Sequence, residues 1–311
     1  MNGKIVILGY GPVGRAATEI LARRGADLRV AQRSAPKILP AGVKFVACDI
    51  LDADSVRAAC EGAAQVVLAI GFAYDGAVWR KSWPRAVDNT LEACAANGAR
   101  LVFFDNLYMY GPQNAPMTEA TPLADYGVKP AVRAAITRVW MAASQAGRVK
   151  VAAVRAPDFY GPGVGLTVLG DSAFGALAKG KTALYVGSAD LPHDFAYVPD
   201  CGRAVVSLLD APDDAFGRAW HVPCAPTRTA REILTLAAVA LGRPLRLQAL
   251  PLWALRPLSL FVPDLRGVVE MRFNWDRPYY VDASDFRARF WSDPTPFEIG
   301  VPATAKSFME T

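Results

Sequence analysis

The sequence predicts an α/β protein, with a doubly wound parallel sheet and a smaller C-terminal lobe. First, short and nearly all-apolar runs alternate with helical stretches through the first half of the chain. Such runs are typical of strands buried on both faces, and helical crossovers between strands make the sheet parallel. Second, this alternation stops near residue 156, after which prolines, glycines and aromatic residues become frequent. With 311 residues, the chain can form one large domain or two closely packed ones.

The expected elements follow from the apolar runs and the helical stretches between them. Strands are predicted at 3–8, 27–31, 43–47, 65–70, 100–105 and 149–155, and helices at 12–24, 53–61, 84–97 and 130–147. We expect a first domain over 1–158, to which 194–225 returns. The remaining residues, 159–193 and 226–311, are expected to form the substrate-binding lobe. A sheet of this kind binds its ligand at the carboxyl ends of the strands.

The first predicted strand runs into a glycine-rich turn and then into a helix. Two glycines without side chains let the backbone turn tightly and approach a pyrophosphate, and a third lets the helix lie close to the sheet. The first amides of the helix can then donate hydrogen bonds to the phosphates. This G-x-G-x-x-G pattern predicts a Rossmann-like domain that binds a dinucleotide through Gly9, Gly11, Pro12, Val13 and Gly14.

The end of the second predicted strand favours NADP(H), with NAD(H) as the alternative. NAD sites usually place an acid here to hold the ribose 2′-hydroxyl, and this chain has none. Arg33 and Ser34 are instead candidates to hold a 2′-phosphate, although Arg33 could also be only a solvated loop charge. After the third strand, Asp49 is expected to accept a hydrogen bond from the adenine amino group. Two further cofactor-binding candidates are Ile50 and Ala69.

Composition excludes several other classes of protein. Five dispersed cysteines are typical of reduced thiols in the cytoplasm, and only two histidines exclude a multi-histidine metal centre, so no metal site is expected. A strand that begins within four residues of the N-terminus leaves no room for a signal peptide. The net charge of +5 suits ligands that carry phosphate, but the basic residues are dispersed and predict no nucleic-acid binding.

One apolar stretch, 250–262, could suggest a membrane contact. It is shorter than the ~20 apolar residues of a membrane span, and it contains Arg256 and two prolines. We therefore expect a helix or lid that lines an apolar pocket, and no membrane contact.

Three later segments carry a resemblance to a known family. Residues 100–111 read RLVFFDNLYMYG, residues 154–163 read VRAPDFYGPG and residues 193–200 read HDFAYVPD. Together with the glycine motif, their order and spacing resemble those of the extended short-chain dehydrogenase/reductases, the NAD-dependent epimerase/dehydratase family. The resemblance covers residues 3 to about 235. It implies a Rossmann-like sheet, a small C-terminal substrate lobe and often a homodimer formed through a helix bundle.

The catalytic motif of that family is altered in this chain. The family uses Tyr-x-x-x-Lys on one helix, where the ammonium lowers the pKa of the phenol and holds the nicotinamide ribose, together with a Ser or Thr after the fifth strand. Here Tyr126 and Lys129 are three residues apart, and Pro130 stands where the lysine should be. If Lys129 is the family lysine, Asp125 takes the place of the tyrosine. Pro130 also suits the first turn of a helix, which would leave Tyr126 in the preceding loop. Asn106 occupies the serine position.

Two explanations compete. In a remodelled enzyme, Lys129 contacts the ribose, the amide of Asn106 holds a carbonyl oxygen, and Tyr126, Tyr108 or Tyr110 supplies the proton. Tyr110 could equally pack under the turn. The alternative is a non-catalytic, NADP(H)-binding redox-sensing regulator. We favour an NAD(P)-dependent oxidoreductase or epimerase/dehydratase-like enzyme that transfers hydride to or from a carbonyl or alcohol.

The expected substrate is a small molecule less charged than a sugar nucleotide. The family's sugar-nucleotide epimerases hold the substrate diphosphate with an arginine, and His193, a weaker and mostly neutral partner, stands at that position. Asp158 replaces an asparagine that contacts substrate and would repel a diphosphate. Aromatic residues, among them Tyr74 and Trp79, suggest an aromatic or cyclic substrate, although each could also belong to the core.

Overall fold

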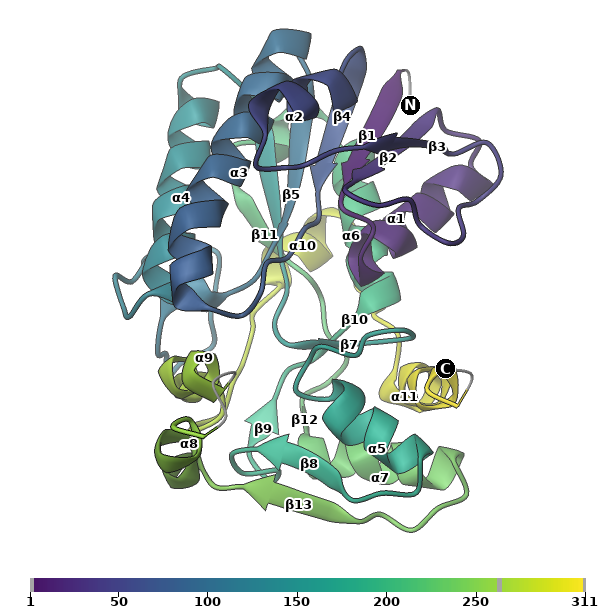
Figure 1. Ribbon diagram of the computed structural model, residues 1–311, viewed down its shortest axis with the longest axis vertical. Coiled ribbons are helices and arrows are strands. Elements are labelled where there is room, and N and C mark those ends of the chain that lie inside the picture. Colours follow the sequence, from purple (N-terminus) through teal and green to yellow (C-terminus); the bar gives the residue numbers. More distant parts are fainter. Residues whose placement is uncertain (1–2, 262–264, 310–311) are drawn as a thin grey trace. The chain divides into compact units, whose positions relative to one another are not determined.

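The computed structural model describes residues 3–261 and 265–309, and its largest element is a seven-stranded sheet (Figure 1). The pairs β1–β2, β1–β4, β2–β3, β4–β5 and β5–β6 are all parallel. The order 3-2-1-4-5-6 within this sheet is that of dinucleotide-binding folds, so the predicted Rossmann-like sheet is confirmed. Across the sheet the strands are β11 (Ala219–His221), β6 (Val151–Arg155), β5 (Arg100–Asp105), β4 (Ala63–Leu68), β1 (Lys4–Leu8), β2 (Leu28–Gln32) and β3 (Lys44–Ala47).

The inner strands form where the sequence is continuously apolar. All five residues of β6 are buried, as are Ile5, Val6 and Ile7 of β1, because helices cover both faces of the sheet. The six predicted strands lie within two residues of their observed bounds.

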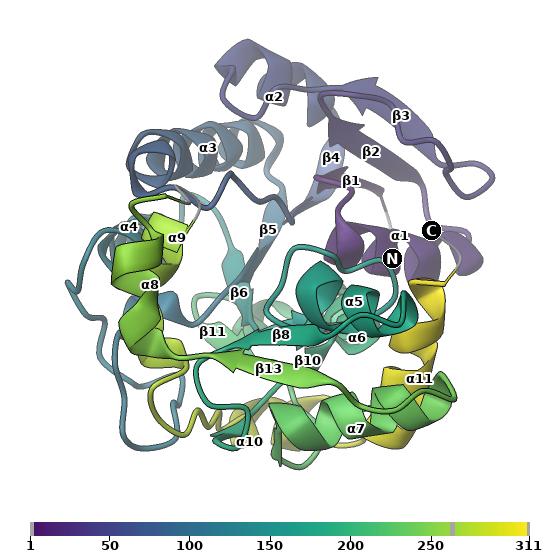
Figure 2. The ribbon, with the colours of Figure 1, turned by 60° about the horizontal axis from the view of Figure 1, so that its bottom comes forward.

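Five helices form the layers on the two faces. Figures 1 and 2 show α2, α3 and α4 over one face, and α1 and α6 over the other. Gly202 allows α6 to approach α1 closely, because a Cβ atom there would lie 2.7 Å from the Cβ of Ala16. These helices are α1 (Pro12–Arg23), α2 (Ala53–Ala59), α3 (Gly76–Asn97), α4 (Lys129–Gln145) and α6 (Val198–Asp210).

The third helix begins eight residues earlier than the sequence predicts. The predicted range, 84–97, begins at Pro84, and proline is favoured in the first turn of a helix, but Pro84 lies inside α3. Asp75 caps the true start, where its carboxylate accepts hydrogen bonds from the amides of Ala77 and Val78. The additional turns bury Trp79 and Trp83, and this burial offsets the backbone hydrogen bond that the proline removes.

The chain divides into two units. The first contains Met1–Met109, Leu123–Ala156 and Cys201–Trp220, and the second contains Tyr110–Pro122, Pro157–Asp200 and His221–Thr311. The second unit thus takes in 110–122, 157–158, 194–200 and 221–225, which the sequence assigned to the first domain. For 110–122 the reason is local pairing: the amide of Met117 donates to the carbonyl of Tyr280, and the amide of Asp282 donates to the carbonyl of Met117.

The second unit contains three strand pairs and short helices. The pair β8 (Ala183–Val186) and β13 (Leu247–Leu250) is parallel and lies beside α5 and α7 in Figure 2. α7 (Ala230–Ala240) begins with a capping box between Thr229 and Glu232. The other pairs are β7 (Phe159–Tyr160) with β10 (Ala196–Tyr197) and β9 (Pro192–His193) with β12 (Arg228–Thr229); the other α-helices are α5 (Ala176–Ala178), α8 (Leu252–Leu258), α9 (Leu265–Glu270), α10 (Ser284–Arg289) and α11 (Phe297–Ser307).

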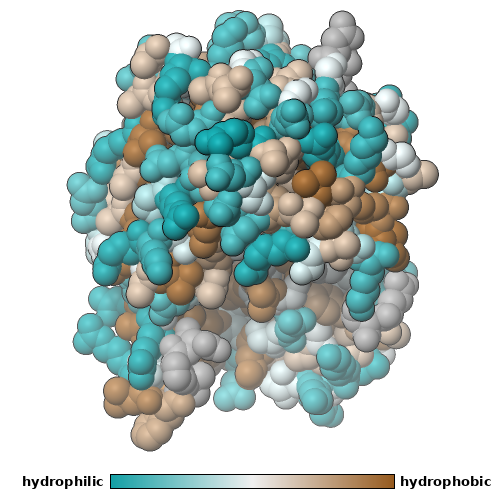
Figure 3. All heavy atoms as spheres, turned by 45° about the horizontal axis from the view of Figure 1, so that its top comes forward, coloured by the Kyte–Doolittle hydropathy of each residue, from teal (hydrophilic) through white to brown (hydrophobic). Residues whose placement is uncertain are grey.

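Hydrophilic side chains predominate on the face shown in Figure 3, with apolar ones scattered among them. Within 3–261 and 265–309, no helix is both long and apolar enough to cross a membrane. The apolar stretch 250–262 contains α8, and its last residue, Val262, lies outside the described residues. The same part of the chain contains no cluster of acidic, histidine and cysteine side chains that could hold a metal ion.

Candidate active site

The three glycines of the N-terminal motif have different local roles. Gly9 has a φ of +99°, and a Cβ atom there would lie 2.5 Å from the carbonyl oxygen of Ala69. A Cβ at Gly14 would overlap the carbonyl of Gly9. By contrast, a Cβ at Gly11 would meet nothing within 4 Å, so open space lies over the N-cap residue of α1, directly ahead of Pro12 and Val13. This arrangement fits a phosphate group held against bare backbone at the helix N-terminus.

At the end of β2, Gln32 stabilises the loop that carries Arg33 and Ser34. Its side-chain oxygen accepts a hydrogen bond from the amide of Tyr10 (3.1 Å), and its side-chain nitrogen donates to the carbonyl of Ser34 (2.8 Å). Arg33 and Ser34 are exposed. The predicted phosphate-binding side chains therefore lie on a loop tied to the glycine turn.

The next cofactor candidates lie after β3. Asp49 is exposed, and its carboxylate accepts a hydrogen bond from the amide of Leu51 (3.0 Å). The carbonyl of Ile50 accepts one from the side chain of Asn89 (3.0 Å). Asp52 caps α2 through the amide of Ser55. Asp49 and Ile50 thus sit in an ordered turn between β3 and α2.

The altered catalytic motif lies at the start of α4. The helix begins at Lys129, with Pro130 in its first turn, so Tyr126 remains in the preceding loop as the sequence predicted. Lys129 is completely buried, and its ammonium nitrogen lies 4.5 Å from the centre of the Tyr74 ring. Asn106, directly after β5, accepts a hydrogen bond from the amide of Tyr108 (3.0 Å). The structure thus places Asn106 and Lys129 in the first unit, after β5 and at the start of α4.

Tyr74, Trp79 and Tyr108 form an aromatic cluster in the first unit. The Trp79 and Tyr108 rings are stacked, with their centres 6.1 Å apart, and Tyr74 meets Trp79 edge-on at 5.7 Å. The hydroxyl of Tyr74 donates to that of Tyr108 over 3.4 Å. Trp79 is only 4 % exposed, and its indole donates to the carbonyl of Ala73, so its ring packs beneath the two phenols.

A buried charge cluster beneath these residues was missed by the sequence reasoning. Arg133 lies 3.0 Å from one carboxylate oxygen of Asp105, and Arg155 lies 3.7 Å from the other and donates to Thr137. The Arg133 guanidinium also lies 3.6 Å from the centre of the Trp83 ring. Burial lowers the pKa of Arg133, and Asp105 opposes that shift. The available signal was the spacing of four between Lys129 and Arg133, which places both on one face of α4.

Tyr110 belongs to the second unit and is completely buried. Its hydroxyl lies 2.9 Å from Nε2 of His221, and Nδ1 of the same ring lies 2.9 Å from the carbonyl oxygen of Asp282. Tyr110 thus packs under the turn, with its hydroxyl bonded to the His221 ring.

His193 and Asp158, the two predicted substrate contacts of the lobe, lie together in the second unit. Nε2 of His193 is 3.3 Å from a carboxylate oxygen of Asp158, which also accepts a hydrogen bond from the indole of Trp275 (3.2 Å). The His193 ring is 2 % exposed and lies against the rings of Tyr279 (4.6 Å, nearly parallel) and Phe195 (4.4 Å). The side chain that replaces the family arginine is therefore fixed among aromatic rings.

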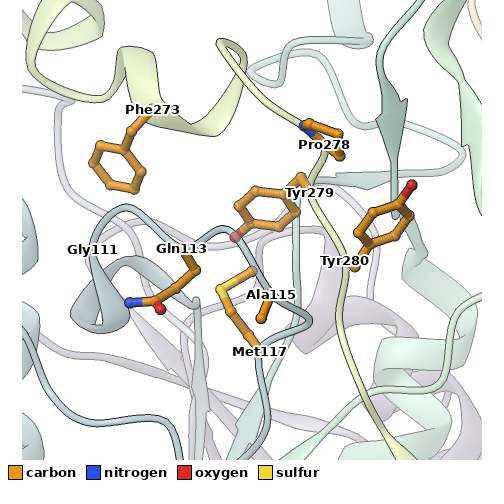
Figure 4. A pocket seen from close by; sticks show the side chains of 8 residues that line it. All are labelled: Gly111, Gln113, Ala115, Met117, Phe273, Pro278, Tyr279 and Tyr280. Carbon is orange, nitrogen blue, oxygen red and sulfur yellow. The ribbon is translucent and has the colours of Figure 1, made fainter.

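A small pocket in the same unit includes Tyr279 in its wall (Figure 4). Its lining comes from two segments of the chain. A backbone hydrogen bond between Met117 and Tyr280 joins them. The lining residues are Gly111, Gln113, Ala115, Met117, Phe273, Pro278, Tyr279 and Tyr280.

Several solved structures with the same fold are epimerases or dehydratases. UDP-glucose 4-epimerase from Thermus thermophilus, in complex with NAD, is 20% identical with a TM-score of 0.77, and the match covers 98% of each chain. UDP-glucuronic acid 4-epimerase from Bacillus cereus, in complex with NAD, is 15% identical with a TM-score of 0.79 over 99% of each chain. A dTDP-glucose 4,6-dehydratase variant from Streptomyces venezuelae is 19% identical with a TM-score of 0.79, covering 100% of this chain and 98% of the other. At these identities the similarity establishes the fold.

No curated protein matches the chain. The model of one protein family, described as the NAD dependent epimerase/dehydratase family, matches residues 5–222, which is most of the chain. The members that this description names are NAD-dependent enzymes, so the match confirms the expectation that the chain is an enzyme. The glycine turn, the strand order and this match agree: the chain belongs to the NAD-dependent epimerase/dehydratase family.

Proposed function

We propose that the chain is an NAD(P)-dependent oxidoreductase or epimerase-type enzyme that acts by hydride transfer on a small carbonyl or alcohol substrate. The observation that carries this proposal is the turn at Gly9, Gly11 and Gly14, where only Gly11 faces open space. A fold that needed glycine only for packing would have close neighbours at all three positions. Open space at the helix N-terminus supports a bound pyrophosphate.

NADP(H) is the proposed coenzyme, and NAD(H) is the alternative. Gln32 has both polar ends of its side chain bonded to backbone groups, and the exposed Arg33 and Ser34 follow it. A guanidinium suits a 2′-phosphate, whereas a ribose 2′-hydroxyl is usually held by an acid. The epimerases from Thermus thermophilus and Bacillus cereus were solved with NAD, which supports NAD(H) as the competing coenzyme.

The bound coenzyme would supply or accept the hydride, and residues of the chain would hold the reacting groups. Lys129 is the proposed ribose contact, because its ammonium lies at the start of α4. The Asn106 side-chain oxygen already accepts a hydrogen bond from Tyr108, so its side-chain NH2 group is the part suited to a substrate carbonyl oxygen. A neutral amide stabilises that oxygen as charge develops on it.

The lobe supports a substrate without a diphosphate. His193 lies among Phe195 and Tyr279, and its nearest charged partner is Asp158. A histidine paired with a carboxylate contributes little net positive charge, so it attracts a diphosphate less than an arginine would. We therefore propose a neutral aromatic or cyclic carbonyl compound as substrate.

The resemblance to the family also implies a homodimer. Separately, the five buried thiols support a reducing, cytoplasmic location. Both are proposals. Light scattering coupled to size exclusion tests the first: a mass of 33.4 kDa for the eluting species would contradict the dimer.

The test of function is NADPH oxidation against a panel of aromatic and cyclic ketones, with NADH in parallel. We expect turnover of at least one ketone, and loss of the rate in Lys129→Met, which keeps the apolar length of the side chain but removes the ammonium. Coenzyme binding without turnover of any panel member would favour the non-catalytic, redox-sensing alternative.

A further inference from the structure

The proposed reaction needs a proton donor, and the family tyrosine is not at its usual place. Tyr126 lies in the loop before α4, where 37 % of it is exposed, and Tyr110 is buried against His221 in the second unit. Tyr108 is different because it lies two residues after Asn106, the residue at the serine position. The hydrogen bond from the Tyr108 amide to the Asn106 side chain orders the turn that carries both residues.

The Tyr108 ring stacks on Trp79, and its hydroxyl contacts the partly exposed Tyr74. Its stacking on Trp79, with ring planes 17° apart, limits the orientations that the phenol can take. Its hydroxyl accepts a hydrogen bond from the hydroxyl of Tyr74 over 3.4 Å, and Tyr74 is 36 % exposed. Two phenols in contact, one half-buried and one reaching solvent, form a short path for a proton.

Two cations lie close to this pair of phenols. Lys129 lies 4.5 Å from the centre of the Tyr74 ring. Burial lowers the pKa of Arg133, and attraction to Asp105 and then to Tyr108 opposes this shift. The same attraction stabilises a phenolate at Tyr108, because the interaction between two charged forms is mutual. Both guanidinium groups, Arg133 and Arg155, lie within 4 Å of the Asp105 carboxylate, directly before Asn106 in the chain.

We propose that Tyr108 is the catalytic acid and base of this enzyme and that Tyr74 relays its proton to and from solvent. This inference rests on the proposed function. In the reductive direction, the carbonyl carbon gains a hydride from the reduced coenzyme as the Tyr108 hydroxyl gives its proton to the carbonyl oxygen, which becomes the alcohol. Tyr108 is left as the phenolate. Tyr74 then gives it a proton and regains one from water, so that both phenols are restored.

The experiment compares three phenylalanine variants of the full chain on the best ketone from the panel. Tyr108→Phe should lower kcat by about 10²-fold or more, the usual contribution of a general acid, with the dissociation constant for NADPH unchanged within twofold. Tyr74→Phe keeps the ring against Lys129 and removes only the hydroxyl that returns a proton to Tyr108 after each turnover. It should therefore lower the steady-state kcat at least fivefold, while the single-turnover rate stays within twofold. Tyr197→Phe is the matched control outside the aromatic cluster and should leave both rates unchanged.

Tyr126→Phe is the competing arm. Loss of the single-turnover rate in Tyr126→Phe, with Tyr108→Phe near the wild-type rate, would overturn this inference and leave the proposed function intact. Equal slowing of single-turnover and steady-state rates in Tyr74→Phe would overturn the relay, because a merely structural contact would slow both. A wild-type chain that binds NADPH but reduces no ketone would overturn both proposals.

Discussion

Replacing Gly11 with alanine should separate coenzyme binding from folding. Gly11 has φ −71° and ψ −172°, a conformation open to any residue, and its added Cβ would meet nothing within 4 Å. The cost to stability is then limited to the weaker N-cap preference of alanine, at most about 1 kcal/mol. In a chain of this size, such a loss lowers the thermal midpoint by roughly 2–4 °C or less.

The effect of Gly11→Ala on binding should be much larger. A methyl group over the helix N-terminus keeps the phosphate away from the backbone amides, and each lost hydrogen bond to a charged group is worth about 1.5–3 kcal/mol. Affinity for NADPH should therefore fall about 10- to 100-fold. At a concentration that stabilises the wild type by about 2.7 kcal/mol, the variant should gain only about 0.4–1.4 kcal/mol.

The assay is the thermal midpoint with and without NADPH, and Gly14→Ala is its matched control. The Gly14 Cβ would overlap the carbonyl of Gly9, so this variant should lose stability even without coenzyme, by about 1–3 kcal/mol. Full stabilisation of Gly11→Ala by NADPH would refute the reasoning, as would a Gly14→Ala variant that is as stable as the wild type.

Three further predictions concern the coenzyme, the ribose contact and pH. Arg33→Ala should weaken NADPH binding at least tenfold while NADH binding changes less than twofold, as measured by calorimetry; equal losses for both coenzymes would contradict a 2′-phosphate contact. Lys129→Met should raise the dissociation constant for NADPH several-fold in the same titration, and an unchanged value would remove Lys129 from the ribose site. Burial raises the pKa of Asp194, outweighing its hydrogen bonds with Thr227 and Val281. Because the folded chain then holds this proton more tightly than the unfolded chain, the stability from Asp194 is full below the unfolded pKa of about 3.9 and is lost as pH rises through the folded pKa. Asp194→Asn should flatten that part of the curve of unfolding free energy against pH, and an unaltered slope would contradict the shift.

The sheet could be predicted from sequence because its strands are buried on both faces. An apolar run as short as β1 or β6, between turn signals, is typical of a buried strand. The glycine turn after β1 then indicates where α1 begins. Two local signals competed at the start of α3: Asp75 is a preferred N-cap residue, whereas Pro84 suits the first turn of a helix. The Asp75 cap and the burial of Trp79 and Trp83 together explain why the helix begins earlier.

The site was predicted less completely, since its contacts join distant parts of the chain. The sequence singled out Asn106, Lys129 and Tyr74, but it gave no sign that Tyr74 would meet Tyr108. Nor did it show that Asp105 would lie between two guanidinium groups. Tyr108 stood in the sequence only as one of three phenols, and the hydrogen bond to Asn106 distinguishes it from the others.

Calorimetric titration of the wild-type chain with NADPH, and separately with NADH, most directly tests whether the glycine turn is a coenzyme site. We predict saturable binding at one site per chain, tighter for NADPH than for NADH. If neither coenzyme binds at millimolar concentration, the open space at Gly11 is not a pyrophosphate site, and the proposed reaction has no hydride carrier.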